Sequence, residues 1–221
     1  MLTKLRSLLI FSVLLAGPAA ADLVIDVEGV AQPTPVAVVP FGWEGQGRAM
    51  PLNVATVITA DLRRSGRFAP IAEDKMLQKP TDGVDVDFQD WSFVGVEAVV
   101  VGKLVQTDND RFTLQFQLFD VFGQRQLVGF RMPNVTRATM RGAAHRAADM
   151  IYEKLTGIKG VFATKVAFVT AERNQQGQTY RLVVADQDGF NETVVMQSKD
   201  PIMSPAWSPD SRRLAYVSFE N

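Results

Sequence analysis

Residues 204–220 read SPAWSPDSRRLAYVSFE, and the second half of this stretch repeats the character of residues 165–172, which read KVAFVTAE. The two copies begin at Lys165 and Arg213, 48 residues apart. One four-stranded propeller blade occupies about 40 to 50 residues and needs neighbours to bury both of its faces. The repeat therefore predicts that residues 163–221 form an incomplete β-propeller, with the first blade and the start of the second, and that the chain is the front part of a longer protein.

The sequence from Thr164 onward has a purely β pattern, with strands expected at 166–170, 180–186 and 192–197. Between the last two, Asp186-Gln187-Asp188-Gly189 resembles the start of a calcium-binding loop, but the remaining ligands and the closing glutamate are missing. We therefore expect a hairpin turn there. Without neighbouring blades this region should expose apolar side chains, which are expected to include Val166, Phe168, Leu182 and Trp207.

Residues 36–162 predict an α/β (α+β) domain with a mixed sheet. A short apolar strand is expected at 36–41, followed by a helix at 52–63 that ends at Ser65-Gly66. The clearest helix spans 139–155, carries one apolar face and ends at Gly157. The remaining elements are short helices and strong strands, expected at 72–78 and 88–94 for the helices and at 97–105, 111–122 and 126–132 for the strands.

Residues 1–21 have the features of a secretory signal peptide. Lys4 and Arg6 precede an apolar run at 8–16, and Ala19-Ala20-Ala21 provides a small-residue cleavage site. The apolar run is too short to cross a bilayer, which requires about 20 residues. The sequence therefore predicts export, and the absence of cysteine favours a bacterial periplasm.

Residues 22–35 are expected to form an N-terminal arm. Apolar and polar residues alternate at 22–30, which is typical of an extended segment, and two prolines then separate it from the α/β domain. This segment is interpreted either as an edge strand of that domain or as a detachable arm that adds a strand to a partner's sheet. In the second case Leu23, Ile25 and Val27 would fill alternate pockets of the partner.

The charge distribution and the residue types exclude several classes of function. Removal of the signal peptide leaves 21 basic and 24 acidic residues, a net charge of −3, with both signs interspersed. This pattern argues against nucleic-acid binding and against a polybasic membrane patch. The lack of cysteine also rules out a disulfide framework and a thiolate metal site.

No catalytic constellation is evident. The single histidine, His145, lies one position off the apolar stripe of the 139–155 helix, and neither a Gly-x-Ser-x-Gly nor an HExxH motif accompanies it. We expect a boundary histidine with a structural hydrogen bond, and no catalytic residue, cofactor or metal site. The loop from Gly42 to Gly47 partly matches a dinucleotide fingerprint, but Met50 takes the third glycine position. A small-molecule-binding module therefore stays open as an alternative.

Five segments carry a resemblance to a known family. The chain resembles the N-terminal half of the TolB family of the Tol-Pal system, and the match rests on residues 38–43 (VVPFGW), 61–68 (DLRRSGRF), 98–102 (AVVVG), 152–160 (YEKLTGIKG) and 205–210 (PAWSPD). The combination of the last two segments is the most specific part. Ser211 departs from the glycine usual in the repeat, which makes that turn less permissive.

The resemblance implies a non-enzymatic periplasmic adaptor with a six-bladed propeller. Such an adaptor links TolA of the inner-membrane complex with Pal, an outer-membrane lipoprotein, and supports outer-membrane invagination during cell division and outer-membrane integrity. The Pal surface would lie mostly on propeller blades beyond this chain. The TolA-binding arm would be Asp22, Leu23, Val24, Ile25, Asp26, Val27, Glu28, Gly29 and Val30.

A second hypothesis is a propeller-containing periplasmic peptidase. Trp-Ser-Pro-Asp repeats also occur in the propellers of some peptidases, so the segment at 205–210 fits this class as well. The catalytic domain would then lie downstream of residue 221. A Gly-x-Ser-x-Gly motif after the last blade would favour this hypothesis.

Overall fold

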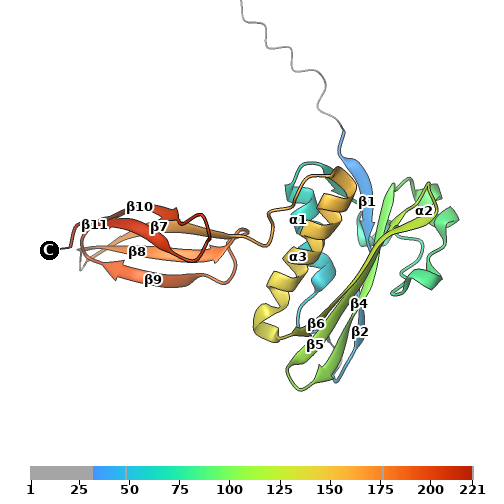
Figure 1. Cartoon of the computed structure of the whole chain (residues 1–221), viewed down its shortest axis with the longest axis horizontal. Coiled ribbons are helices and arrows are strands. Elements are labelled where there is room, and N and C mark those ends of the chain that lie inside the picture. Colours follow the sequence, from blue (N-terminus) through green and yellow to red (C-terminus); the bar gives the residue numbers. More distant parts are fainter. Residues whose placement is uncertain (1–31, 48, 176, 221) are drawn as a thin grey trace, which may run out of the picture. The chain divides into compact units, whose positions relative to one another are not determined.

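The computed structural model describes residues 32–47, 49–175 and 177–220 (Figure 1). The predicted signal peptide and the proposed TolA-binding residues 22–30 lie outside the described residues. The α/β region comprises β1 (Thr34–Val38), β2 (Gly42–Glu44), α1 (Val54–Arg64), β3 (Phe68–Pro70), η1 (Glu73–Lys75), η2 (Gly83–Asp85), α2 (Phe88–Val94), β4 (Ala98–Asp108), β5 (Arg111–Asp120), β6 (Arg125–Val135) and α3 (Arg137–Thr156). The propeller-like region comprises β7 (Lys165–Asn174), β8 (Gly177–Asp186), β9 (Thr193–Ser198), β10 (Ile202–Trp207) and β11 (Leu214–Ser218).

The α/β region is built on one mixed sheet, as the sequence predicted, and its strand order is β3-β1-β4-β5-β6, with β2 pairing β4. Strands β1 and β3 run parallel, β1 and β2 both pair in parallel with β4, and β4, β5 and β6 form an antiparallel meander. Pro40 separates β1 from β2, because proline cannot donate to a strand ladder. The two short strands therefore lie one after the other along the same edge of β4.

Strand β4 explains why both faces of this sheet are covered. Its apolar run alternates, so that Ala98 and Val100 enter one core while Val99 and Val101 enter the other. The larger core lies under α1 and α3, and the smaller core contains Trp91 of α2 (Figure 1). The sheet thus positions α1 and α3 side by side on one face, where the candidate site is found.

Both long helices begin and end with local signals that the sequence provides. The Asn53 side chain accepts a hydrogen bond from the Thr56 amide at 3.1 Å and caps α1. Thr136 and Thr139 form a reciprocal capping box at the start of α3. Gly157 ends α3 in the left-handed conformation with φ 73°, which glycine adopts without steric cost.

One predicted helix is wrong. Residues 72–78 form only the 3-10 turn Glu73–Lys75, and none of the three residues in that turn is buried. A short helix gains most of its stability from a packed apolar face, and within 72–78 only Met76 packs against a core while Leu77 is exposed. The neighbouring helix predicted at 88–94 is confirmed, because Trp91 anchors it in the core.

The propeller-like region contains two antiparallel sheets. Strands β7, β8 and β9 form a three-stranded meander, and β10 pairs with β11. The expected exposure of Val166 and Trp207 is confirmed, since both are more than a third exposed, whereas Leu182 is fully buried. Its expected exposure is wrong, because Leu182 lies on the central strand β8, and β10 of the second sheet contacts both β7 and β8.

None of the helices in the described part of the chain combines the length and apolar character needed to cross a membrane.

Candidate functional site

A cluster of buried charges joins the two regions of the chain. The turn after β8 carries Asp188, and the Arg141 side chain of α3 donates a short hydrogen bond to its carboxylate. The preceding residue, Gln187, donates its side-chain amide to Asp61 of α1 at 3.2 Å. The hairpin turn expected at Asp186 to Gly189 is confirmed, because the Gly189 amide donates to the Asp186 carbonyl at 2.9 Å. Two side chains of this turn reach the helices: Gln187 contacts α1 and Asp188 contacts α3.

The centre of the cluster is the pair formed by His145 and Asp61. The Nδ1 atom of His145 lies 2.6 Å from the Oδ2 atom of Asp61, and neither side chain is more than 1% exposed. On its other side, the Nε2 atom of His145 faces Asp188 Oδ2 at 3.5 Å and makes no hydrogen bond. The expected structural hydrogen bond of His145 is present, but the predicted boundary position is wrong, because the residue is fully buried.

Arg141 balances the carboxylate of Asp188. Its guanidinium also lies 3.6 Å from the centre of the Phe190 ring. This cation–π contact joins α3 to the turn that carries Asp188. Burial acts to raise the pKa of Asp188, but the hydrogen bonds from Arg141 and the Phe190 amide, with the charges of Arg141 and His145, outweigh burial and lower this pKa. Asp188 is therefore an anion paired with the Arg141 guanidinium.

The same three side chains meet the spacing of a metal site, since ligand atoms of Asp61, His145 and Asp188 lie within 4.8 Å of one another. The donor set argues against a metal. Nδ1 of His145 is engaged by Asp61, and the Arg141 guanidinium already contacts the Asp188 oxygen that faces Nε2. A cation of the protein thus occupies the position at which a metal would be needed.

The segment between α3 and β7 is fixed by Asp149. Its carboxylate accepts hydrogen bonds from the amides of Phe162 at 2.6 Å and Ala163 at 3.1 Å. Burial raises the pKa of Asp149, and these two hydrogen bonds oppose the shift. A Cβ atom on Gly160 would lie 2.4 Å from the Asp149 carboxylate, so only glycine fits there.

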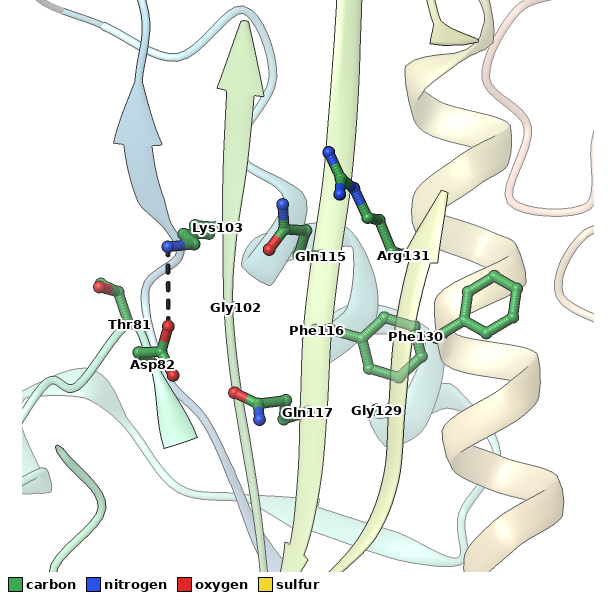
Figure 2. Close-up of a pocket in the computed structure, with 10 residues that line it drawn as sticks. All are labelled: Thr81, Asp82, Gly102, Lys103, Gln115, Phe116, Gln117, Gly129, Phe130 and Arg131. Atoms are coloured by element: carbon green, nitrogen blue, oxygen red, sulfur yellow. Dashed lines mark ion pairs between the residues drawn. The ribbon is translucent and has the colours of Figure 1, made fainter. Parts of the chain in front are cut away.

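A second candidate site is a pocket of about 290 Å³ on the sheet (Figure 2). Figure 2 shows Lys103 of β4 and Asp82 joined by an ion pair, with Gln115 and Gln117 on the next strand. Lys103 also contacts Glu44 at 3.1 Å, and the hydrogen bond and charge of Glu44 raise the pKa of Lys103. The charge of this lysine is therefore already neutralised by two carboxylates of the chain.

The glycine-rich loop predicted as a possible ligand site is used for packing. A Cβ atom on Gly45 would lie 2.3 Å from the Trp43 ring, and one on Gly42 would meet Thr81 at 3.0 Å. The Trp43 indole donates to the Gly47 carbonyl at 3.2 Å, and the Gln46 amide donates to the Gln106 side chain at 2.8 Å. These contacts account for Gly42 and Gly45 without a bound phosphate.

Sequence reasoning identified His145 but missed its partners Asp61, Arg141 and Asp188. The signal for Asp61 was present, because the residue stands seven positions after Val54, on the apolar stripe of α1. A carboxylate on a buried stripe requires a partner.

Comparison with known proteins places the chain in a family. The model of the TolB amino-terminal domain matches residues 23–127, and the model of the TolB β-propeller domain matches residues 152–221. The chain belongs to the TolB family. The resemblance seen in the five sequence segments is thereby confirmed.

Relatives of known name support this assignment. The chain is 48% identical over 98% of its length to the Tol-Pal system protein TolB of Thioalkalivibrio sulfidiphilus, and 43% identical over its whole length to that of Pasteurella multocida. It spans about half the length of these TolB relatives, 50% and 52%. The crystal structure of TolB from Acinetobacter baumannii superposes with a TM-score of 0.72 and 36% identity, covering 86% of this chain and 45% of that one.

Proposed function

We propose that this chain is the front part of a non-enzymatic periplasmic adaptor of the Tol-Pal system. One observation carries the proposal: the TolB amino-terminal and propeller domains follow one another here as in relatives named Tol-Pal system protein TolB. Residues 1–21 act as the signal peptide, and 36–162 and 163–221 are the α/β domain and the incomplete propeller. The protein supports outer-membrane integrity and invagination during cell division.

The partner of the N-terminal arm is TolA. Residues 22–30 alternate between apolar and polar side chains, as a strand does when it adds to the edge of another sheet. Backbone hydrogen bonds supply affinity, and Leu23, Ile25 and Val27 supply specificity. The propeller binds Pal, mostly through blades that follow residue 221.

The experiment is binding of the whole chain, without its signal peptide, to the periplasmic domain of TolA. Deleting residues 22–30 abolishes binding if the arm is the TolA site. As a matched pair, Ile25→Asp should weaken binding more than Val24→Asp, because the two side chains point to opposite sides of an extended segment. Unchanged affinity after the deletion would show that residues 22–30 do not form the TolA site.

The propeller itself is proposed to be six-bladed. Strand β7 corresponds to β11 in the repeat, and β11 pairs with β10, whereas β7 pairs only with β8 among the described residues. We infer that a further strand of the whole protein completes the sheet of β7. A crystal structure of the whole protein with a different number of blades would overturn this part of the proposal.

A further inference from the structure

We propose that His145 is a doubly protonated imidazolium and that, with Asp61, Arg141 and Asp188, it forms a charge lock that holds the propeller-like region against helices α1 and α3. The lock does not depend on the proposed binding of TolA or Pal. It concerns how the two regions of this chain are coupled, and its test uses neither partner.

The first step concerns the hydrogen-bond donors of the imidazole. Both ring nitrogens of His145 face carboxylates, Asp61 at 2.6 Å and Asp188 at 3.5 Å. A neutral imidazole has one N–H and one lone pair, so one nitrogen would direct its lone pair at an anion. Only the imidazolium presents a proton to both carboxylates.

The second step concerns the carboxylate of Asp61. Its Oδ1 atom accepts hydrogen bonds from Gln187 at 3.2 Å and from Arg64 at 3.4 Å, while Oδ2 faces His145. Two donors on Oδ1, one of them the Arg64 guanidinium, favour the ionised form, because a carboxylate accepts hydrogen bonds more strongly than a neutral carboxyl group. Asp61 therefore supplies a negative charge and not a proton to the pair.

The third step is the charge balance of the buried groups. Asp61 and Asp188 contribute two negative charges, and Arg141 contributes one positive charge, with all three side chains largely or fully buried. Asp149 of α3 adds a further nearby carboxylate, and Arg64 of α1 is partly exposed. An uncompensated buried charge is costly, and protonation of His145 balances the cluster.

The fourth step is the location of the charges. Asp61 lies on α1, His145 and Arg141 lie on α3, and Asp188 lies on the turn after β8. Removing the charge of Asp188 therefore weakens the contact between the regions without altering an element of the α/β core. The backbone bond from the Gln187 amide to the Thr164 carbonyl, at 3.2 Å, lies within the propeller-like region and reports on the order of the turn that carries Asp188, because the side chain of the same residue, Gln187, donates to Asp61.

The protonation state is tested on the unsubstituted chain by nuclear magnetic resonance with ¹⁵N in the imidazole ring. His145 is the single histidine, so an untagged protein gives one set of ring signals. We expect the signature of two protonated nitrogens at neutral pH. A signature of one protonated and one bare nitrogen would overturn the proposal. So would a shift of the ring signals on adding Zn²⁺ or Mg²⁺, because the cluster would then be a metal site.

The lock is tested by hydrogen exchange in Asp188→Asn, with the exposed Asp200→Asn as the matched control. We expect exchange of the Gln187 amide to accelerate by about tenfold or more in Asp188→Asn, because a charged hydrogen bond is lost. Exchange in Asp200→Asn should match the parent chain. Equal protection of the Gln187 amide in both variants would contradict the lock. If Asp188→Asn also unfolds the α/β region, the ring signals of the parent chain still decide the protonation state of His145, on which the lock depends.

Discussion

The Nδ1 atom of His145 and the Oδ2 atom of Asp61 lie 2.6 Å apart in the interior, although the residues are 84 positions apart in the sequence. This pair joins α1 to α3 and fixes the surface onto which the turn after β8 packs. Removing one partner of a buried charged hydrogen bond strongly destabilises the folded state, because the other partner stays buried without a compensating charge.

Substitution of Asp61 by Asn should therefore destabilise the α/β region. We expect a loss of about 3–5 kcal/mol in the free energy of unfolding, because His145 would be left without its anion. Urea unfolding followed by tryptophan fluorescence, to which the buried Trp91 contributes, measures the loss. The exposed Asp74→Asn should change stability by less than about 0.5 kcal/mol.

A double-mutant cycle separates this interaction from general packing. If Asp61 acts through His145, the combined change Asp61→Asn with His145→Gln should cost less than the sum of the two single changes. Strict additivity of the three free energies would show that the 2.6 Å contact contributes no coupling.

The stabilisation that the ionised Asp188 contributes should depend on pH. Its pKa is lowered in the folded chain, so the folded state binds fewer protons than the unfolded state. In the unfolded state an aspartate has a pKa of about 3.9. The stabilisation by Asp188 is therefore fully present above that value and is lost as the pH falls through the lowered pKa. We expect the stability difference between the parent chain and Asp188→Asn to be constant near neutrality and to shrink in acid.

The pKa of Asp149 is shifted in the opposite direction from that of Asp188, so the pH dependence of the parent chain alone does not isolate Asp188. Burial raises the pKa of Asp149, and the stability that Asp149 contributes decreases as the pH rises through the titration range. Urea unfolding of both chains across the acidic range isolates Asp188, because Asp149 is common to both. A stability difference that does not change with pH would argue against an ionised Asp188 in the cluster.

The uncovered strands of the propeller-like region should bind a hydrophobic dye. Val194 and Val195 are neighbours on β9, at the irregularity in its pairing with β8, and are 53% and 54% exposed, so neither side chain is covered. We expect Val195→Lys to reduce dye fluorescence and to change stability by less than about 0.5 kcal/mol. Val183→Lys is the contrasting change, since Val183 is buried and the substitution should unfold this sheet. Equal dye fluorescence of Val195→Lys and the parent chain would show that the exposed Val195 on β9 does not bind the dye.

The parts of the fold that the sequence predicted correctly are those with a local signal. The period of α3 and its glycine stop were visible in the residues, as were the alternating strands β4 and β5 and the turn at Asp188. The 48-residue repeat indicated the propeller strands before any pairing was known. Each of these signals depends on neighbours within a few residues or on an internal copy.

The charge cluster has no such local signal. Gln187 contacts Asp61 across 126 positions, and no periodic pattern specifies which buried polar groups meet. Asp61 on an apolar stripe indicated that a partner was required, but not which one. The expected exposure of Leu182 failed for a related reason, because no local pattern specifies that β10 of the second sheet contacts β8.

Gly160 and Gly142 should respond to substitution by alanine with opposite changes in stability. A Cβ atom on Gly160 would lie 2.4 Å from the Asp149 Oδ1 atom and 2.6 Å from its Cα atom, so the segment would have to shift. A Cβ atom on Gly142, within α3, would meet no atom within 4 Å. Gly160→Ala should therefore cost about 1–3 kcal/mol through overpacking. Gly142→Ala should stabilise the chain by about 0.5–1 kcal/mol, because alanine favours the helix.

Urea unfolding of the two alanine variants measures these opposite changes, and hydrogen exchange locates the first. In Gly160→Ala the amides of Phe162 and Ala163 should lose protection, because they donate to the carboxylate that the new methyl group displaces. In Gly142→Ala the same amides should exchange as in the parent chain. If Gly160→Ala left both the stability and the protection of these two amides unchanged, the close approach of Gly160 to Asp149 would not constrain this segment.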